Sequence, residues 1–210
     1  MVDFGKRKLV MGIASAISLA GCVSPIEIAN YSEMLNNIWL AEFQKSAREQ
    51  HFRIIEMDSV IAYKSAKDAL LELGMPIVAE NPIEGIILSS ANAPTPLSSD
   101  EWRQVVKMEN PRVRKISNGT MYLDEDPKGF FIDVEVEVKR IQKNLTRVRL
   151  NYRLRNPSYA SMGFQLPKFA PPQAALLGSL RYWKVLDEAI LKRTGLKGKS
   201  RKLKPDELIA

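Results

Sequence analysis

Two segments in the second half of the chain alternate strictly between apolar and polar residues. The apolar positions of the first are Phe130, Ile132, Val134, Val136 and Val138. Those of the second are Val148, Leu150, Tyr152 and Leu154. A period of two places successive side chains on opposite faces of a β-strand, so one face of each strand is expected to be buried. The pattern predicts a long antiparallel hairpin with one apolar and one charged face.

The charged residues of this hairpin favour one register. With the turn centred on Lys143, the expected cross-strand pairs are Ile141–Leu145, Glu137–Arg149 and Asp133–Arg153. Opposite charges then face each other on the outer surface. The outward arginines of the second strand are Arg147, Arg149, Arg153 and Arg155. We interpret this stripe as a solvated face on which the two carboxylates neutralise two of the arginines, in preference to a surface for nucleic acid or anionic lipid.

Apolar residues spaced three and four apart predict helices elsewhere in the chain. One covers 32–50. Another begins at an N-cap, Asp58 or Ser59, and ends at Gly74, because glycine readily adopts the left-handed conformation that closes a helix. The last covers 172–195.

A further helix begins at a capping box formed by Ser98 and Glu101. We expect it to end before Pro111, since proline lacks the backbone N–H that continues a helix. The following Asn118-Gly119 leaves two interpretations open. It is either the tight turn of a second hairpin, or the glycine ends an extension of this helix.

Shorter apolar runs complete the pattern. Residues 51–57 predict a strand with no clean face, while 77–79 and 86–88 flank the turn sequence 81–85 of a hairpin. The resulting order, α-β-α-β-β-α-β-β-α, lacks the long strand–helix alternation of a parallel sheet. It predicts an α+β fold, with an antiparallel β-sheet of hairpins and helices packed on one face.

The amino-terminal segment has a different character. Basic residues 6–8 precede an apolar run over 9–19, which is shorter than the roughly 20 residues of a membrane span. The run closes on Leu19-Ala20-Gly21-Cys22, which holds the only cysteine of the chain. These residues resemble the signal peptide and lipobox of a bacterial lipoprotein precursor, although Asp3 departs from the usual basic start.

This resemblance implies cleavage before Cys22, a thioether-linked diacylglycerol on its sulfur, and a further fatty acid such as palmitate on the new amino terminus. A thiolate is the nucleophile that such lipid transfer needs. Two or three acyl chains hold a protein firmly on a membrane. Because Val23 is not the aspartate that retains many lipoproteins at the inner membrane, the resemblance implies the outer membrane, with the protein facing the periplasm. The alternative is an ordinary signal peptide that is cut elsewhere.

These features divide the chain into a signal peptide (1–21), a tether (22–31), a single α+β periplasmic domain (32–195) and a basic flexible tail (196–210). The apolar fraction of 45% is typical of a folded protein, and the net charge of +7 is a modest excess of positive charge.

The basic side chains of the tail are Lys197, Lys199, Arg201, Lys202 and Lys204. Three interpretations of them stay open: contact with anionic headgroups, contact with an acidic partner, or solubility alone.

Residues that could carry out chemistry are few. His51 is the only histidine, so a serine-hydrolase triad must use it, and no nucleophile elbow accompanies it. Zinc sites need several Cys or His ligands, which the chain lacks once Cys22 is lipidated. The acidic run Asp124-Glu125-Asp126 precedes Pro127 and indicates a turn more than a cation site. We expect no catalytic residue, no metal and no cofactor.

The sequence therefore predicts a non-enzymatic accessory or scaffold subunit of an envelope assembly or secretion complex, whose partners are envelope proteins and not nucleic acid. In element order alone, the domain is similar to small periplasmic lipoprotein subunits such as those of the β-barrel assembly machinery. The alternative is a binding module for a hydrophobic or cell-wall ligand. Residues 156–172 would then be its lid, with the apolar side chains Tyr159, Met162, Phe164 and Phe169. Cell-wall hydrolysis through a carboxylate pair is the least favoured alternative.

Overall fold

The computed structural model describes residues 17–19, 24–157, 169–195 and 200–201. Its main sheet has six strands in the order β3-β4-β6-β7-β2-β8, and all neighbouring strands are antiparallel. In that order the strands are Ile77–Asn81, Ile86–Asn92, Phe131–Gln142, Leu145–Arg155, Phe52–Ile55 and Ser200–Arg201. A separate two-stranded pair joins β1 (Ile17–Leu19) to β5 (Met121–Leu123). The first of these two strands lies within the predicted signal peptide.

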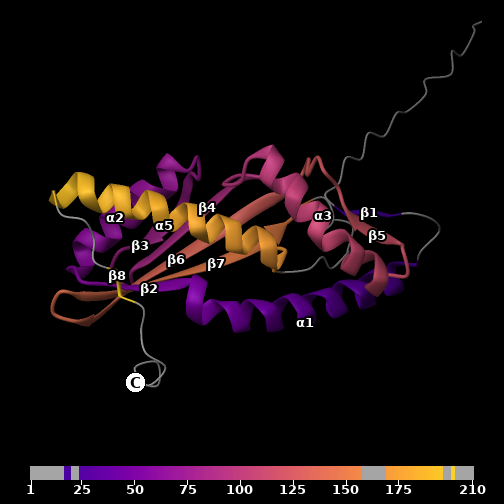
Figure 1. Cartoon of the computed structure of the whole chain (residues 1–210), viewed down its shortest axis with the longest axis horizontal. Coiled ribbons are helices and arrows are strands. Elements are labelled where there is room, and N and C mark those ends of the chain that lie inside the picture. The colour runs from indigo at the N-terminus through magenta and orange to yellow at the C-terminus, as the bar shows by residue number, and fades with distance from the viewer. Residues whose placement is uncertain (1–16, 20–23, 158–168, 196–199, 202–210) are drawn as a thin grey trace, which may run out of the picture.

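The described helices are α1 (Pro25–Gln50), α2 (Ser59–Glu72), α3 (Ser99–Ile116) and α5 (Pro172–Thr194). Helix α5 lies across one face of the sheet, with α2 towards one end and α3 towards the other, and α1 runs along the lower side (Figure 1). The prediction of an α+β fold, with an antiparallel sheet and helices packed on one face, is confirmed.

The β6–β7 hairpin has the predicted register over most of its length. Glu137 lies opposite Arg149, and the other predicted charged pair is also opposite. The turn differs by one residue, because Leu145 pairs with Gln142 and not with Ile141. Asn144 adopts a positive φ of 62°, which lets the chain reverse more tightly than the predicted turn. The prediction that Ile141 faces Leu145 was therefore wrong, and Ile141 occupies a bulge.

One hydrophobic cluster joins the sheet to all four of these helices. Trp39, Trp102 and Trp183 are fully or almost fully buried in it and come from three different helices. Helix α5 lies close against β7 at Gly178, where an added Cβ would stand 3.0 Å from the ring of Tyr152. A larger residue at this position would push the helix off the sheet. The described residues thus share one core.

Helix α1 begins earlier than the predicted start at Ser32. Ser24 and Glu27 form a reciprocal capping box: the Ser24 N–H donates to Glu27 Oε2 at 2.9 Å, and the Glu27 N–H donates to Ser24 Oγ at 3.2 Å. Pro25 starts the helix, where its missing N–H costs nothing. Ile28 is 3% exposed and anchors this first part of the helix. The helix therefore takes up most of the segment 22–31 that we interpreted as a tether.

Helix α2 and the β3–β4 hairpin follow the predictions closely. Asp58 is the N-cap of α2 and accepts from the Val60 N–H at 2.8 Å. The chain leaves the helix at Gly74, whose φ is +72°. The hairpin turn lies between Asn81 and Ile86, as its sequence indicated.

Helix α3 begins at the predicted capping box but continues through Pro111 to Ile116, so the prediction that it ends before this proline was wrong. Pro111 is exposed, which leaves the missing hydrogen bond on the solvent side, where water can satisfy the free carbonyl group. Val113, two residues after Pro111, is fully buried and holds the last turn of the helix against the core. Of the two interpretations of Asn118-Gly119, the helix extension is correct: the Gly119 N–H bonds to the Arg114 carbonyl.

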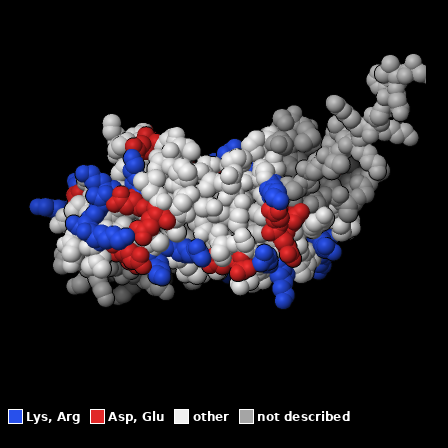
Figure 2. Space-filling view, turned by 90° about the horizontal axis from the view of Figure 1, so that it is seen from above, with Lys and Arg blue, Asp and Glu red and all other residues white. Residues whose placement is uncertain are grey.

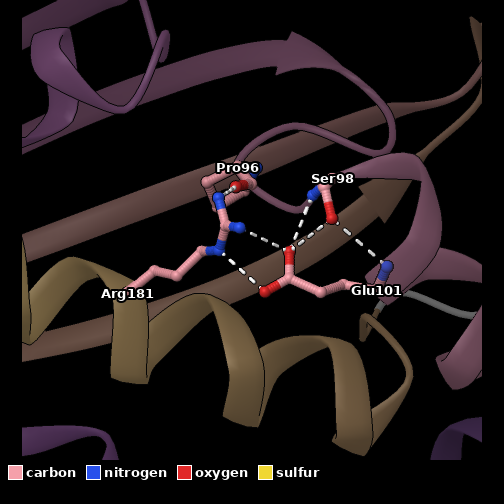
Figure 3. Close-up of polar contacts among 4 residues, drawn as sticks. All are labelled: Pro96, Ser98, Glu101 and Arg181. Atoms are coloured by element: carbon pink, nitrogen blue, oxygen red, sulfur yellow. Dashed lines mark hydrogen bonds and ion pairs between the residues drawn. The ribbon is translucent and has the colours of Figure 1, made fainter.

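Two polar contacts join α3 to α5. In the first, Glu101 completes the capping box of Ser98 and also binds Arg181 of α5, whose Nε donates to Glu101 Oε1 at 2.9 Å (Figure 3). Arg181 further donates to the Pro96 carbonyl at 3.2 Å. The residues that start α3 therefore also fix the position of α5.

The second contact centres on Glu109, a carboxylate that is only 2% exposed. It accepts from Arg112 Nη2 at 2.6 Å and from the backbone N–H of Gln173, in the first turn of α5, at 3.3 Å. Arg112 also pairs with Glu42 of α1. No side chain within α5 caps the amino terminus of this helix. The carboxylate of Glu109, which belongs to α3, caps it instead. Glu109 thus joins α1, α3 and α5.

The segment 196–210, predicted as a flexible tail, contributes β8. Ser200 and Arg201 pair with Ile55 and Ile54 at the edge of β2. These two residues add a short strand at the edge of β2, whose backbone would otherwise be unpaired on that side.

We predict that Glu109→Gln lowers the free energy of unfolding by about 2 kcal/mol, because hydrogen bonds to a buried charge contribute about that much. Urea unfolding of the full chain measures the change. The matched control is Asp126→Asn, which removes a carboxylate whose ion pair with Lys128 is largely exposed. This substitution should leave stability almost unchanged. Equal effects of the two substitutions would contradict the role assigned to Glu109.

Candidate functional site

His51 lies beside a serine but deep in the core. Its Nδ1 is 2.8 Å from Ser179 Oγ, a distance that a nucleophile and its base could have. His51 is 2% exposed, however, and Ser179 is fully buried. The imidazole stacks on Phe43 with ring centroids 4.4 Å apart. A substrate could not reach this pair without opening the core, so the contact serves packing between the start of β2 and α5.

Burial also keeps this histidine neutral. It lowers the pKa of His51 from 6.5 to about 4, since the charged form would lose its hydration in the core. Burial likewise raises the pKa of Tyr152, whose hydroxyl group hydrogen-bonds to Ser179. The cluster therefore carries no charge at neutral pH.

The acidic run at 124–126 forms the turn that its sequence indicated. Asp124 Oδ1 accepts from the Asp126 N–H at 2.9 Å, and Asp126 pairs with Lys128 at 2.6 Å. In the part of the chain that the structure describes, no group of three or more His, Cys, Asp or Glu side chains could hold a metal ion.

The sheet has one face that no described helix covers. Across this face runs a hollow of about 500 Å³, which we call the central hollow. Its apolar lining comes from Val78, Leu88 and Phe131, and its polar lining includes Asp133, Glu135 and Arg153. Val78 is 62% exposed. The hollow combines an apolar floor with a charged rim, as protein and ligand contact surfaces do.

The arginine stripe lies on this face, but its ion pairs differ from the predicted ones. Asp133 binds Arg155, with Nε at 2.8 Å from Oδ2, and also accepts from Ser90 at 2.6 Å. Glu137 pairs with Lys139 on its own strand. The predicted charged partners, although opposite in register, therefore do not form contact ion pairs. The prediction that Glu137 neutralises Arg149 was wrong, because Glu137 pairs with Lys139, whereas Arg153 still interacts electrostatically with Asp133.

A smaller hollow, of about 200 Å³, lies between α1 and β7, and we call it the α1 hollow. Arg149, Asn151 and Arg153 form one side, and the rest is lined by Leu40, Phe43, Gln44 and Phe169. Of the four apolar side chains named for the predicted lid, Phe169 is the one that the structure describes. Tyr159, Met162 and Phe164 lie outside the described residues.

A third groove separates α2 from the β3–β4 turn and has a volume of about 760 Å³. Tyr63 lies in it and donates a hydrogen bond to Glu80 at 3.2 Å, and burial together with this carboxylate raises the pKa of Tyr63 to about 12. Lys67 pairs with the same Glu80 at 2.7 Å. Charges of both signs gather at this end of the molecule, where α2 and the last part of α5 lie (Figure 2). They largely neutralise each other, which disfavours a site for a strongly charged ligand.

The predicted anchor and most of the basic tail fall outside the described residues. This holds for Cys22 and for Lys197, Lys199, Lys202 and Lys204, whereas Arg201 belongs to β8. Among the described helices, none is both long enough and apolar enough to cross a membrane.

Comparison with known proteins supplies no relative. No protein-family model, no curated protein and no solved structure matches this chain. The roles of its residues therefore rest on the geometry of the chain itself.

The sequence pointed to the arginine stripe but not to the two hollows. The central hollow combines residues from four strands, and only the strand order shows that Val78 and Phe131 share a face. For the start of α1, by contrast, the signal was present, because Ser24 and Glu27 have the spacing of a capping box.

We predict that the imidazole signal of His51 does not titrate between pH 8 and about 5 and has its midpoint near pH 4. Since the unfolded pKa is about 6.5, the unfolded chain binds the proton first, and stability should fall by about 3 kcal/mol as the pH drops from 6.5 to 4. NMR of the full chain follows the signal directly, because no other histidine is present. A midpoint near 6.5 would contradict the buried position.

Proposed function

We propose that the chain is a lipoprotein anchored in the outer membrane through Cys22, facing the periplasm, and that it acts as a non-enzymatic accessory or scaffold subunit of an envelope assembly or secretion complex. The observation that carries the proposal is the lipobox Leu19-Ala20-Gly21-Cys22 after a basic and apolar leader. The central hollow supports it, because a sheet face with exposed apolar residues and a charged rim suits a protein partner.

The burial of the His51–Ser179 pair supports the non-enzymatic part of this proposal. A general base and a nucleophile must reach a substrate, and both side chains are closed off by α1 and α5. Within the central hollow, the carboxylate of Asp133 is engaged in an ion pair with Arg155, and that of Glu135 accepts a hydrogen bond from the Asn151 amide.

A second candidate function is the binding of a hydrophobic or cell-wall ligand. The α1 hollow favours it, because three apolar side chains, Leu40, Phe43 and Phe169, gather there beside polar groups that could orient a ligand.

We predict that the full-length protein fractionates with the outer membrane and incorporates labelled palmitate, and that Cys22→Ala abolishes both properties. The matched control is Ser24→Ala, which changes a neighbouring small residue and leaves the thiol in place. A Cys22→Ala protein that stays membrane-bound and keeps its function would contradict the anchor.

We predict that crosslinking in cells captures a fixed set of envelope proteins with the full-length chain, as mass spectrometry of detergent extracts would identify. Val78→Asp should reduce the recovery of this set at least tenfold, because a carboxylate would lose its water in the apolar floor. Ile83→Asp is the control, since Ile83 is 98% exposed at the tip of the β3–β4 turn and outside the central hollow. Recovery of the chain as a monomer without partners would contradict the scaffold function.

A further inference from the structure

Arg149 and Arg153 are two guanidinium groups whose nearest carboxylates are already engaged. Asp133 is held by Arg155 and Ser90, and Glu135 accepts from the Asn151 amide at 3.0 Å. Both arginines are exposed, and neither forms a contact ion pair with a described residue, although Arg153 interacts electrostatically with Asp133. The positive charge of Arg149, and part of that of Arg153, is therefore available to a ligand.

The two arginines project from the same face of β7. They are four residues apart, so their Cα atoms are separated by roughly 13 Å, with Asn151 between them. An arginine side chain is long enough for both guanidinium groups to approach a ligand placed over this asparagine. A planar guanidinium group can donate two parallel hydrogen bonds to two oxygens of one carboxylate or phosphate group, which a lysine ammonium group cannot do.

The opposite wall of the α1 hollow is mainly apolar. Leu40 and Phe43 of α1 lie on one side and Phe169 on another, and Gln44 adds one amide. The ring centroids of Phe43 and Phe169 are 6.3 Å apart, so the two rings contact each other and form one continuous apolar surface against which a hydrocarbon chain could lie. The hollow is thus cationic on the strand side and apolar on the helix side.

A neighbouring hollow of about 510 Å³ extends this space along β7. It shares Arg153 and Phe169 with the α1 hollow and adds Leu154, Arg155 and Asp133, whose carboxylate is already paired with Arg155. The α1 hollow alone could hold only a head group and a few carbon atoms, whereas the two together have the volume of a typical ligand site.

We propose that the α1 hollow binds the anionic head of an amphiphile, a carboxylate or phosphate group carried on an apolar chain. Arg149 and Arg153 bind the anionic head group of the amphiphile, and the side of the hollow formed by Phe43 and Phe169 contacts its hydrocarbon chain. This inference names the ligand class of the second candidate function and rests on it. It does not depend on the lipid at Cys22 or on a protein partner, so a failure of the scaffold proposal would leave it standing.

Calorimetric titration of the purified full-length protein tests the proposal with three soluble probes: octyl phosphate, octanoate and inorganic phosphate. We expect octyl phosphate and octanoate to bind, and inorganic phosphate to bind at least tenfold more weakly because it lacks the chain. Vesicles of phosphatidylglycerol and of phosphatidylcholine form a second arm. Binding of the soluble probes alone supports a free amphiphile, and additional binding of phosphatidylglycerol vesicles supports a membrane lipid as the source of the same head group.

The variants Arg149→Gln and Arg153→Gln should each weaken octyl phosphate binding about tenfold, because each removes a charge-assisted contact. Arg153→Lys should recover only part of the affinity. The control is Arg103→Gln, which removes an exposed arginine of α3 with the same change of charge. Thermal unfolding of each variant verifies that the fold is retained.

The proposal is overturned if octyl phosphate and octanoate do not bind, or if Arg103→Gln weakens binding as much as the β7 variants do. It is also overturned if inorganic phosphate binds as tightly as octyl phosphate, since the apolar wall would then have no role.

Discussion

The strict alternation of apolar and polar residues along β6 and β7 is the constraint on which the described structure depends. A shift of one residue in either strand would exchange its buried valines for charged side chains. With the observed register the sheet has one apolar face, so α2 and α5 pack there, while side chains of α1 border the charged face beside β7. The hollows on that face are therefore a consequence of the same pattern that builds the core.

Much of the fold could be predicted because its signals are local. The alternation of β6 and β7, the N-cap at Asp58 and the capping box at Ser98 each depend on residues within a few positions of one another. The α+β class follows from the order of these elements. Around the candidate sites, the sequence indicated the arginine stripe and Phe169, but not the α1 residues that face them.

The remaining features depend on contacts between distant segments. Helix α3 passes Pro111 because the core holds the residues beyond it, which local propensity does not include. Glu109 contacts the start of α5 and, through Arg112, also α1, so its role appears only in the assembled structure. The arginine partners were predicted from register alone, yet long side chains reach diagonally, and Asp133 bonds to Arg155 instead of to the residue opposite it.

Helix α1 begins directly after Ser24, which is two positions beyond the predicted lipidation site at Cys22 in the sequence. With 26 residues, α1 is roughly 39 Å long, and β2, with β8 on its edge, follows its far end. On a lipidated chain, anchor and tail are therefore attached near opposite ends of one rod. A lipid attached before α1 would therefore be separated from the β2–β8 edge of the sheet by the length of this helix.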